Sequence, residues 1–153
     1  VLRIVPTSRL SDPLCTPIIR NALGVVMSPE LAERCADNLL GAPRLAAVTH
    51  PDAWSIFAEL AGIELPPANE RPFAHVHFAM DATLAGLGAA VVSWPLCLSE
   101  VAAGRLVAPL GFRRSESALA LLAAPGAESR ALDRFRDWLV AEGAATPEPP
   151  SVP

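Results

Sequence analysis

Residues 73–111, FAHVHFAMDATLAGLGAAVVSWPLCLSEVAAGRLVAPLG, decide the predicted fold of this chain. Their pattern predicts a helix, a tight glycine turn, a buried strand, a second helix and a second strand, in that order. Gly86 and Gly88 bracket the change from helix to strand, and Gly104 ends the second helix before a strand at 105–107. This order is half of an open α/β sandwich, in which small ligands bind at the strand ends. The stretch therefore points to ligand sensing rather than to catalysis.

Strands and helices also alternate on both sides of this stretch. Further strands are predicted at 1–5, 18–27, 45–48 and 118–123. Ser28 followed by Pro29 is the strongest helix start, because serine is a preferred N-cap and proline is tolerated at the first helical position. A second helix is capped by Asp52 and ends at Gly62. The alternation predicts an α/β fold with a mainly parallel sheet and helices on both faces.

Three local features complete the predicted organisation. The strand at 18–27 is expected to be interrupted or bent near Asn21 and Ala22. The last helix, 129–142, is expected to be closed by Gly143 and to turn four large side chains toward a core, namely Leu132, Phe135, Trp138 and Leu139. The proline-rich residues after it are predicted to form a tail that does not pack.

Composition excludes several classes of protein. The chain has 153 residues, of which 52% are hydrophobic and 18% charged, so most of it is not disordered. No apolar run approaches the roughly 18 to 20 residues that span a bilayer, so no membrane partner is predicted. The 12 basic residues are all arginine and are scattered, and the net charge is −4. This segment by itself is therefore not predicted to bind nucleic acid.

The cysteines indicate the cellular compartment of the protein, and the first residue bears on whether the chain is part of a longer one. Cys15, Cys35 and Cys97 are odd in number, widely spaced and without a CxxC pair. They indicate buried thiols in a reducing compartment, and hence a cytoplasmic protein, rather than disulfides or a zinc site. The chain opens on Val1 rather than methionine, which predicts a piece of a longer protein.

Five segments in order resemble the effector-binding domain of LysR-type transcriptional regulators. They are VMSPELA at 26–32, PDAW at 51–54 followed by Gly62, Phe73 with AGLGAA at 85–90, AGRLVAPL at 103–110 and FRDWL at 135–139. The resemblance extends to about Gly143, and the PDAW version is typical of the branch with the glycine-cleavage activator and the β-lactamase regulators.

The resemblance implies a two-lobed fold like that of the type 2 periplasmic binding proteins. It places the second lobe at 23–110, parts of an incomplete first lobe at 1–22 and 111–143, and a disordered tail at 144–153. A small-molecule effector in the cleft between the lobes would modulate DNA binding by a winged helix-turn-helix that lies outside this chain. The resemblance also implies a homodimer or tetramer. It implies no cofactor.

Seven residues are candidates for effector contact. They are Ser28, Thr49, His50, His75, Val76, His77 and Trp94. A structural role remains open for each: Ser28 as a helix cap, Thr49 in a turn, Trp94 in the core, and the histidines as hydrogen-bonded or solvent-facing groups. The family branch often has Asp, Asn or Ser after the phenylalanine where this chain has Ala74.

Histidine and cysteine side chains can also bind metals or act in catalysis. The H-x-H pair with His50 could hold a metal, but no carboxylate or thiol has supporting spacing, so no metal is predicted. No nucleophile elbow, P-loop or paired carboxylate is present, and Cys97 lies between leucines as a buried, inert thiol. The alternatives to a regulator are a solute-binding module of a transport system and, less well supported, a prephenate-dehydratase-like enzyme.

Overall fold

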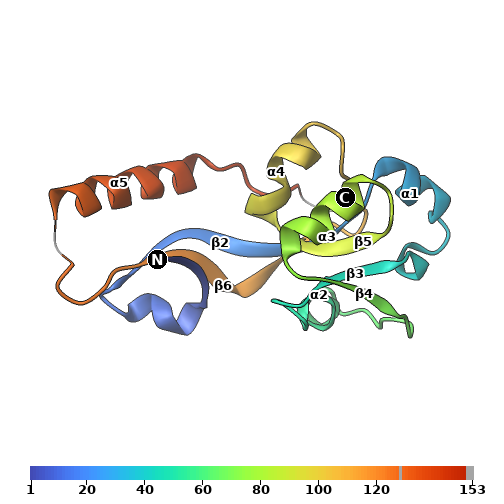
Figure 1. Ribbon diagram of the computed structural model, residues 1–153, viewed down its shortest axis with the longest axis horizontal. Coiled ribbons are helices and arrows are strands. Elements are labelled where there is room, and N and C mark those ends of the chain that lie inside the picture. Colours follow the sequence, from blue (N-terminus) through green and yellow to red (C-terminus); the bar gives the residue numbers. More distant parts are fainter. Residues whose placement is uncertain (128, 151–153) are drawn as a thin grey trace. The chain divides into compact units, whose positions relative to one another are not determined.

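The computed structural model describes residues 1–127 and 129–150, which form two compact units (Figure 1). Unit 1 consists of Val1–Asn21 and Arg114–Glu148. Unit 2 consists of Ala22–Arg113 together with Pro149 and Pro150. The divisions fall inside two long strands, so each of these strands contributes residues to both units.

The sheet of unit 2 is mixed rather than mainly parallel as predicted. Its strands follow the order β2 (Cys15–Val26), β5 (Ala89–Ser93), β3 (Arg44–Ala47) and β4 (Glu70–Phe73). β3 is parallel to β4 and to β5, as expected for strands joined through helices. β2 runs antiparallel to β5, because it enters the unit from the end at which β5 finishes.

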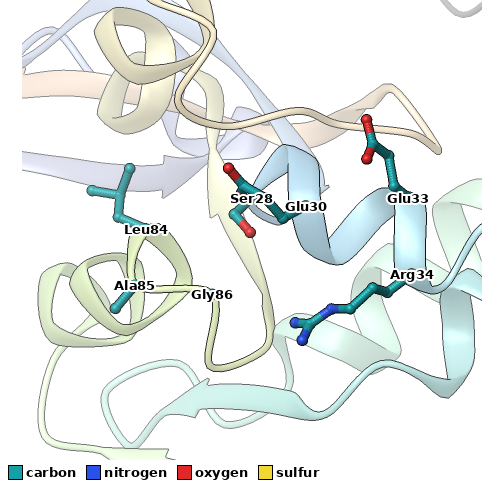
Figure 2. A pocket seen from close by; sticks show the side chains of 7 residues that line it. All are labelled: Ser28, Glu30, Glu33, Arg34, Leu84, Ala85 and Gly86. Carbon is teal, nitrogen blue, oxygen red and sulfur yellow. The ribbon is translucent and has the colours of Figure 1, made fainter.

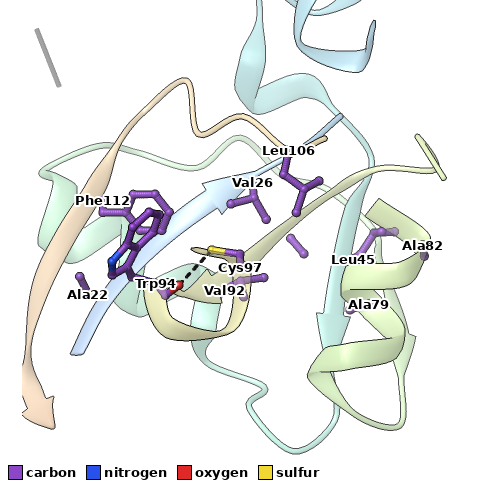
Figure 3. Packing of buried hydrophobic residues seen from close by; sticks show 11 residues of the cluster. Ala22, Val26, Leu45, Ala79, Ala82, Val92, Trp94, Cys97, Leu106 and Phe112 are labelled. Carbon is purple, nitrogen blue, oxygen red and sulfur yellow. Dashed lines mark hydrogen bonds between the residues drawn. The ribbon is translucent and has the colours of Figure 1, made fainter. Parts of the chain in front are cut away.

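Helices cover both faces of this sheet, as predicted. α1 (Pro29–Arg34) and α2 (Ala53–Ala61) contribute Leu31 and Phe57 to one apolar cluster. α3 (Val76–Leu84) and α4 (Trp94–Ala102) contribute to the other, which Figure 3 shows. Successive residues of β5 alternate between the clusters: Ala89 and Val91 join the first, Ala90 and Val92 the second. This alternation explains why all four of these β5 residues are apolar.

Most local signals in unit 2 have the predicted effect. The Ser28 Oγ accepts a hydrogen bond from the Leu31 N–H at 3.3 Å, which confirms the serine as the cap of α1. Gly104 follows the end of α4 with a φ of 70°, a left-handed conformation that glycine adopts without strain. Asp52 occupies the N-cap position of α2, but its side chain makes no capping hydrogen bond.

Three strand predictions need correction. The predicted strand at 105–107 is only an isolated bridge between Met27 and Val107. β2 is continuous through residues 21 and 22, because the strand itself passes from one unit to the other. The strand predicted at 118–123 is longer and forms β6 (Phe112–Leu122), since polar residues such as Ser115 and Glu116 alternate along its first half.

Unit 1 has a much smaller core. It contains β1 (Leu2–Pro6), the 3₁₀ turn η1 (Thr7–Ser11) and the adjoining parts of β2 and β6. Its apolar cluster is formed by the buried residues Val5, Cys15 and Ala120. A second 3₁₀ turn, η2 (Leu39–Gly41), belongs to unit 2.

The last helix differs from its prediction. α5 (Arg130–Ala145) begins at the predicted cap Ser129, whose Oγ accepts from the Leu132 N–H at 3.1 Å. Phe135 and Trp138 do not enter a core but are 46% and 54% exposed. Gly143 does not close the helix. It lies inside α5, where a Cβ would approach the Ile18 carbonyl oxygen to 2.4 Å.

The predicted tail begins later than expected. α5 continues to Ala145, so the first two residues of the predicted tail are helical. Glu148 forms an ion pair with Arg114, with the Nη2 and Oε2 atoms 2.7 Å apart. Residues 151–153 of the predicted tail lie outside the described residues.

Candidate functional site

Two of the predicted segments meet at the carboxyl edge of parallel strands. Thr49 and His50 follow β3, and His75 follows β4. The Val48 N–H donates to the Phe73 carbonyl at 2.8 Å, so the two strand ends are hydrogen-bonded directly. The carboxyl edge is where open α/β sheets bind ligands, because loops and helix N-termini converge there. The structure therefore brings residues 49–50 and 75–77 to the same edge of unit 2.

Thr49 and His50 form a polar turn at this edge. The His50 N–H donates to the Ala47 carbonyl at 2.8 Å, which reverses the chain just after the strand. The His50 Nδ1 lies 3.2 Å from the Thr49 Oγ1, so hydroxyl and imidazole share a hydrogen bond. Both residues are exposed. The opposite imidazole nitrogen, Nε2, is left as a donor or acceptor for a ligand.

His75 and His77 form an aromatic surface at the start of α3. His75 is the N-cap residue, and its side chain makes no capping hydrogen bond. Its ring stacks on that of His77, with centroids 5.5 Å apart and an angle of 13° between the planes. Phe78 lies 4.1 Å from the His77 ring, and its side chain is 47% exposed. Two imidazoles and a phenyl ring are thus presented together.

Sequence reasoning missed Phe78 as a member of this surface. The signal available in the sequence was its position three residues after His75, because residues three apart lie on the same face of a helix. Val76, which was a candidate, is half-buried and packs against the apolar cluster that contains Ala79 and Ala82.

Trp94 also follows a parallel strand, but its side chain is in the core. The indole is 6% exposed and meets the Phe112 ring edge-on, with centroids 5.0 Å apart (Figure 3). Of the two roles considered for Trp94, the structure therefore places the ring among core residues.

Ser28 lies at the opposite edge of the sheet from the histidines. In the antiparallel register of β2 and β5, Val26 pairs with Ala90 and Leu23 with Ser93. The end of β2 that leads to Ser28 is therefore beside the start of β5, whereas the candidate histidines follow the ends of parallel strands. The structure does not bring Ser28 together with them.

Ser28 instead borders a separate, solvent-open hollow of about 530 Å³ (Figure 2). Glu30, Glu33 and Arg34 of the α1 helix line one side of it, and residues 84–86 at the end of α3 line the other. The Ser28 side chain is 4% exposed and serves the α1 cap.

Cys97 is a buried thiol of unit 2. Burial raises the pKa of the Cys97 thiol to about 12, and its Sγ lies 3.6 Å from the carbonyl oxygens of Ser93 and Trp94. This thiol stays protonated and is a poor nucleophile, in line with the prediction of a buried, inert cysteine. In the described residues, no three His, Cys, Asp or Glu side chains are grouped to hold a metal ion.

The exposed residues at the carboxyl edge are suited to binding a ligand rather than to making or breaking covalent bonds. Imidazole nitrogens and the Thr49 hydroxyl can donate to or accept from a polar ligand, and the Phe78 ring can cover an apolar part of it.

Comparisons with known proteins agree on one family. The family model described as the LysR substrate binding domain matches residues 2–144. The HTH-type transcriptional regulator TrpI of Pseudomonas aeruginosa is 33% identical over 124 residues, which cover 76% of this chain and 42% of that protein. The chain thus spans less than half the length of this curated relative.

Solved structures show the same fold at lower identity. The AmpR effector domain of Pseudomonas aeruginosa superposes with a TM-score of 0.74 at 21% identity, covering 94% of this chain and 71% of that one. The AmpR effector-binding domain of Citrobacter freundii gives 0.76 at 20% identity, covering 95% and 74%. Among the described residues, no helix combines the length and apolar character needed to cross a membrane.

Proposed function

Because the chain belongs to the LysR substrate-binding domain family, as part of the effector-binding domain of a LysR-type regulator, we propose that a small-molecule effector binds at the carboxyl edge of β3 and β4. The observation that carries this proposal is the 2.8 Å hydrogen bond from the Val48 N–H to the Phe73 carbonyl. It ties together the strand ends that present Thr49 and His50 on one side and His75 and His77 on the other.

The proposed contacts are made by exposed side chains. Thr49, His50, His75 and His77 offer polar atoms, and Phe78 offers an apolar surface. Ser28 is left out because it lies at the other edge of the sheet and caps α1. Val76 and Trp94 are not proposed to contact the effector. Their side chains pack in the apolar cluster beneath the site and so support α3 and α4.

The same proposal extends to the whole protein. Promoter DNA would be bound by a helix-turn-helix domain outside this chain, since the relative that is 33% identical is named an HTH-type regulator and this chain has a net charge of −4. The protein would act in the cytoplasm as a homodimer or tetramer, without catalytic activity of its own. An effector would act by its different affinity for two arrangements of the protein.

The family match favours a regulator over the solute-binding module of a transport system. Both classes can share a fold, but the relative matched by sequence is a transcriptional regulator. In domain terms, unit 2 would correspond to the second lobe, and unit 1 to the parts of the first lobe present in this chain.

A thermal-shift screen of the complete effector domain tests the proposal. Amino acids, aromatic acids and cell-wall peptides form the panel, and an effector should raise the melting temperature in a concentration-dependent way. The screen is repeated on His75→Ala and His77→Ala. A ligand that shifts the native domain and both variants equally would show that effector binding occurs elsewhere.

A further inference from the structure

Two hollows adjoin at the edge of the unit 2 sheet that lies opposite the histidines. The first, of about 530 Å³, lies between α1 and the turn that follows α3, and the second, of about 450 Å³, lies between α1 and the end of α4. Ser28, Glu30 and Leu84 line both of them. A Cβ on Gly86 would stand 3.5 Å from the Ser28 Oγ, so α1 and the turn after α3 lie close together at this point.

Opposite charges line the first hollow without pairing with each other. Glu30 and Arg34 are four residues apart on α1, a spacing at which glutamate and arginine can form an ion pair. In the described part of the chain, however, neither side chain forms an ion pair or a side-chain hydrogen bond. Figure 2 shows the Arg34 side chain extending toward the turn after α3, whereas Glu33 extends away from it. A free carboxylate and a free guanidinium thus line the same space.

The second hollow contributes apolar lining rather than further free charge. Its charged residues besides Glu30 are Glu100 and Arg105, whose Oε2 and Nε atoms lie 2.5 Å apart. The hydrogen bond from Arg105 holds the pKa of the Glu100 carboxyl below its usual value, so the ion pair is formed at neutral pH. Pro29 and the half-buried Leu84 provide the apolar surface of this part.

This combination of groups is complementary to an α-amino acid. A guanidinium can donate two parallel hydrogen bonds to a carboxylate, and an ammonium group can donate to a glutamate carboxylate. An α-amino acid carries both groups on one carbon atom, so a single small molecule can satisfy two side chains that are one helical turn apart.

We propose that the two hollows form a second ligand site, separate from the one proposed for the effector. Arg34 binds the carboxylate of an α-amino acid, Glu30 binds its ammonium group, and its apolar side chain lies against Leu84.

Isothermal titration of L-leucine into the polypeptide that carries the complete effector domain tests this inference. Leucinamide lacks the carboxylate of leucine, and 4-methylpentanoate lacks its ammonium group, while both keep the apolar side chain. The proposal expects leucine to bind and each analogue to bind about tenfold more weakly or less, because each loses charge-assisted hydrogen bonds.

Two substitutions locate the bound leucine. Arg34→Gln and Glu30→Gln should each raise the Kd of leucine by about tenfold or more, and both residues are exposed, so neither change disturbs the core. Arg71→Gln and Glu59→Gln, at exposed positions of unit 2 outside the hollows, are the matched controls and should leave this Kd unchanged. Circular dichroism checks that each variant is folded.

The result for His75→Ala separates this site from the carboxyl edge, because the proposal expects that variant to bind leucine as the native protein does. Loss of leucine binding in His75→Ala would place leucine at the carboxyl edge and overturn the inference. A native protein that does not bind leucine would overturn it too. So would equal binding of leucine and leucinamide, or an unchanged Kd in Arg34→Gln, since the guanidinium would then hold no carboxylate.

Discussion

The imidazole rings of His75 and His77 lie nearly parallel, with centroids 5.5 Å apart and planes inclined by 13°. His75 is the cap residue of α3, and His77 lies in the first turn of that helix. The His75 side chain makes no hydrogen bond to the helix end, so its ring nitrogens remain able to donate to or accept from a ligand. The stack places two donors or acceptors beside the exposed Phe78 ring.

Replacing either histidine should weaken effector binding while leaving the fold intact. His75→Ala and His77→Ala each remove a polar contact from an exposed position. A lost hydrogen bond to the ligand is worth about 1 kcal/mol, so each change should raise Kd by about fivefold to tenfold. Isothermal titration of the complete effector domain measures Kd, and circular dichroism checks folding. Leu87→Ala, at a residue 53% exposed in unit 2, is the matched surface control.

Ser28→Ala should reduce stability without changing effector affinity. The substitution removes the 3.3 Å hydrogen bond that caps α1, which costs about 1 kcal/mol of unfolding free energy. Ser28→Gly should cost only a few tenths of a kcal/mol, because glycine is tolerated at an N-cap. Urea unfolding measures both. A tenfold loss of effector affinity in Ser28→Ala would contradict the placement of the site at the other edge.

Stability should fall between pH 9 and pH 12 because of Cys97. Burial raises the pKa of its thiol from 9.0 to about 12, so the folded chain holds this proton more tightly than the unfolded chain does. The stabilisation is complete below pH 9 and is lost as the pH rises toward 12, by up to about 1.4 kcal/mol per pH unit. The sequence has no lysine or tyrosine that would add its own titration in this range.

Cys97→Ala isolates this effect. Urea unfolding at pH 8, 9, 10 and 11 should show that the free energy of unfolding falls less steeply with pH in the variant than in the native chain. This holds whatever the difference in stability between the two proteins at pH 8. Cys15 and Cys35 are present in both proteins, so their contribution cancels. Parallel declines would show that the Cys97 thiol titrates normally in the fold.

Gly143→Ala should destabilise the protein although alanine is the better helix former. Propensity alone predicts a gain of about 1 kcal/mol for this change inside a helix. The new Cβ would stand 2.4 Å from the Ile18 carbonyl oxygen, a backbone atom that cannot move aside cheaply. Ala141→Gly, at an exposed site of α5, should lose about 1 kcal/mol from propensity alone. A more stable Gly143→Ala variant would mean that α5 does not pack closely on β2.

The sequence by itself determined the features that depend on neighbouring residues. The start of α1 follows from Ser28 and Pro29, because a serine hydroxyl reaches the N–H three residues on. The end of α4 follows from Gly104, whose φ of 70° suits glycine. The alternation of strands and helices in unit 2, and the segments that resemble the LysR family, also depended on order and spacing along the chain.

Only the tertiary structure decided which of these features share a surface. Thr49 and His75 come to one edge because β3 and β4 are parallel and hydrogen-bonded, whereas Ser28 goes to the other edge because β2 is antiparallel to β5. The apolar pattern of α5 correctly indicated a helix but not its exposure, since burial requires a partner surface that periodicity does not supply. Local sequence sets the conformation of a segment, and long-range pairing sets its neighbours.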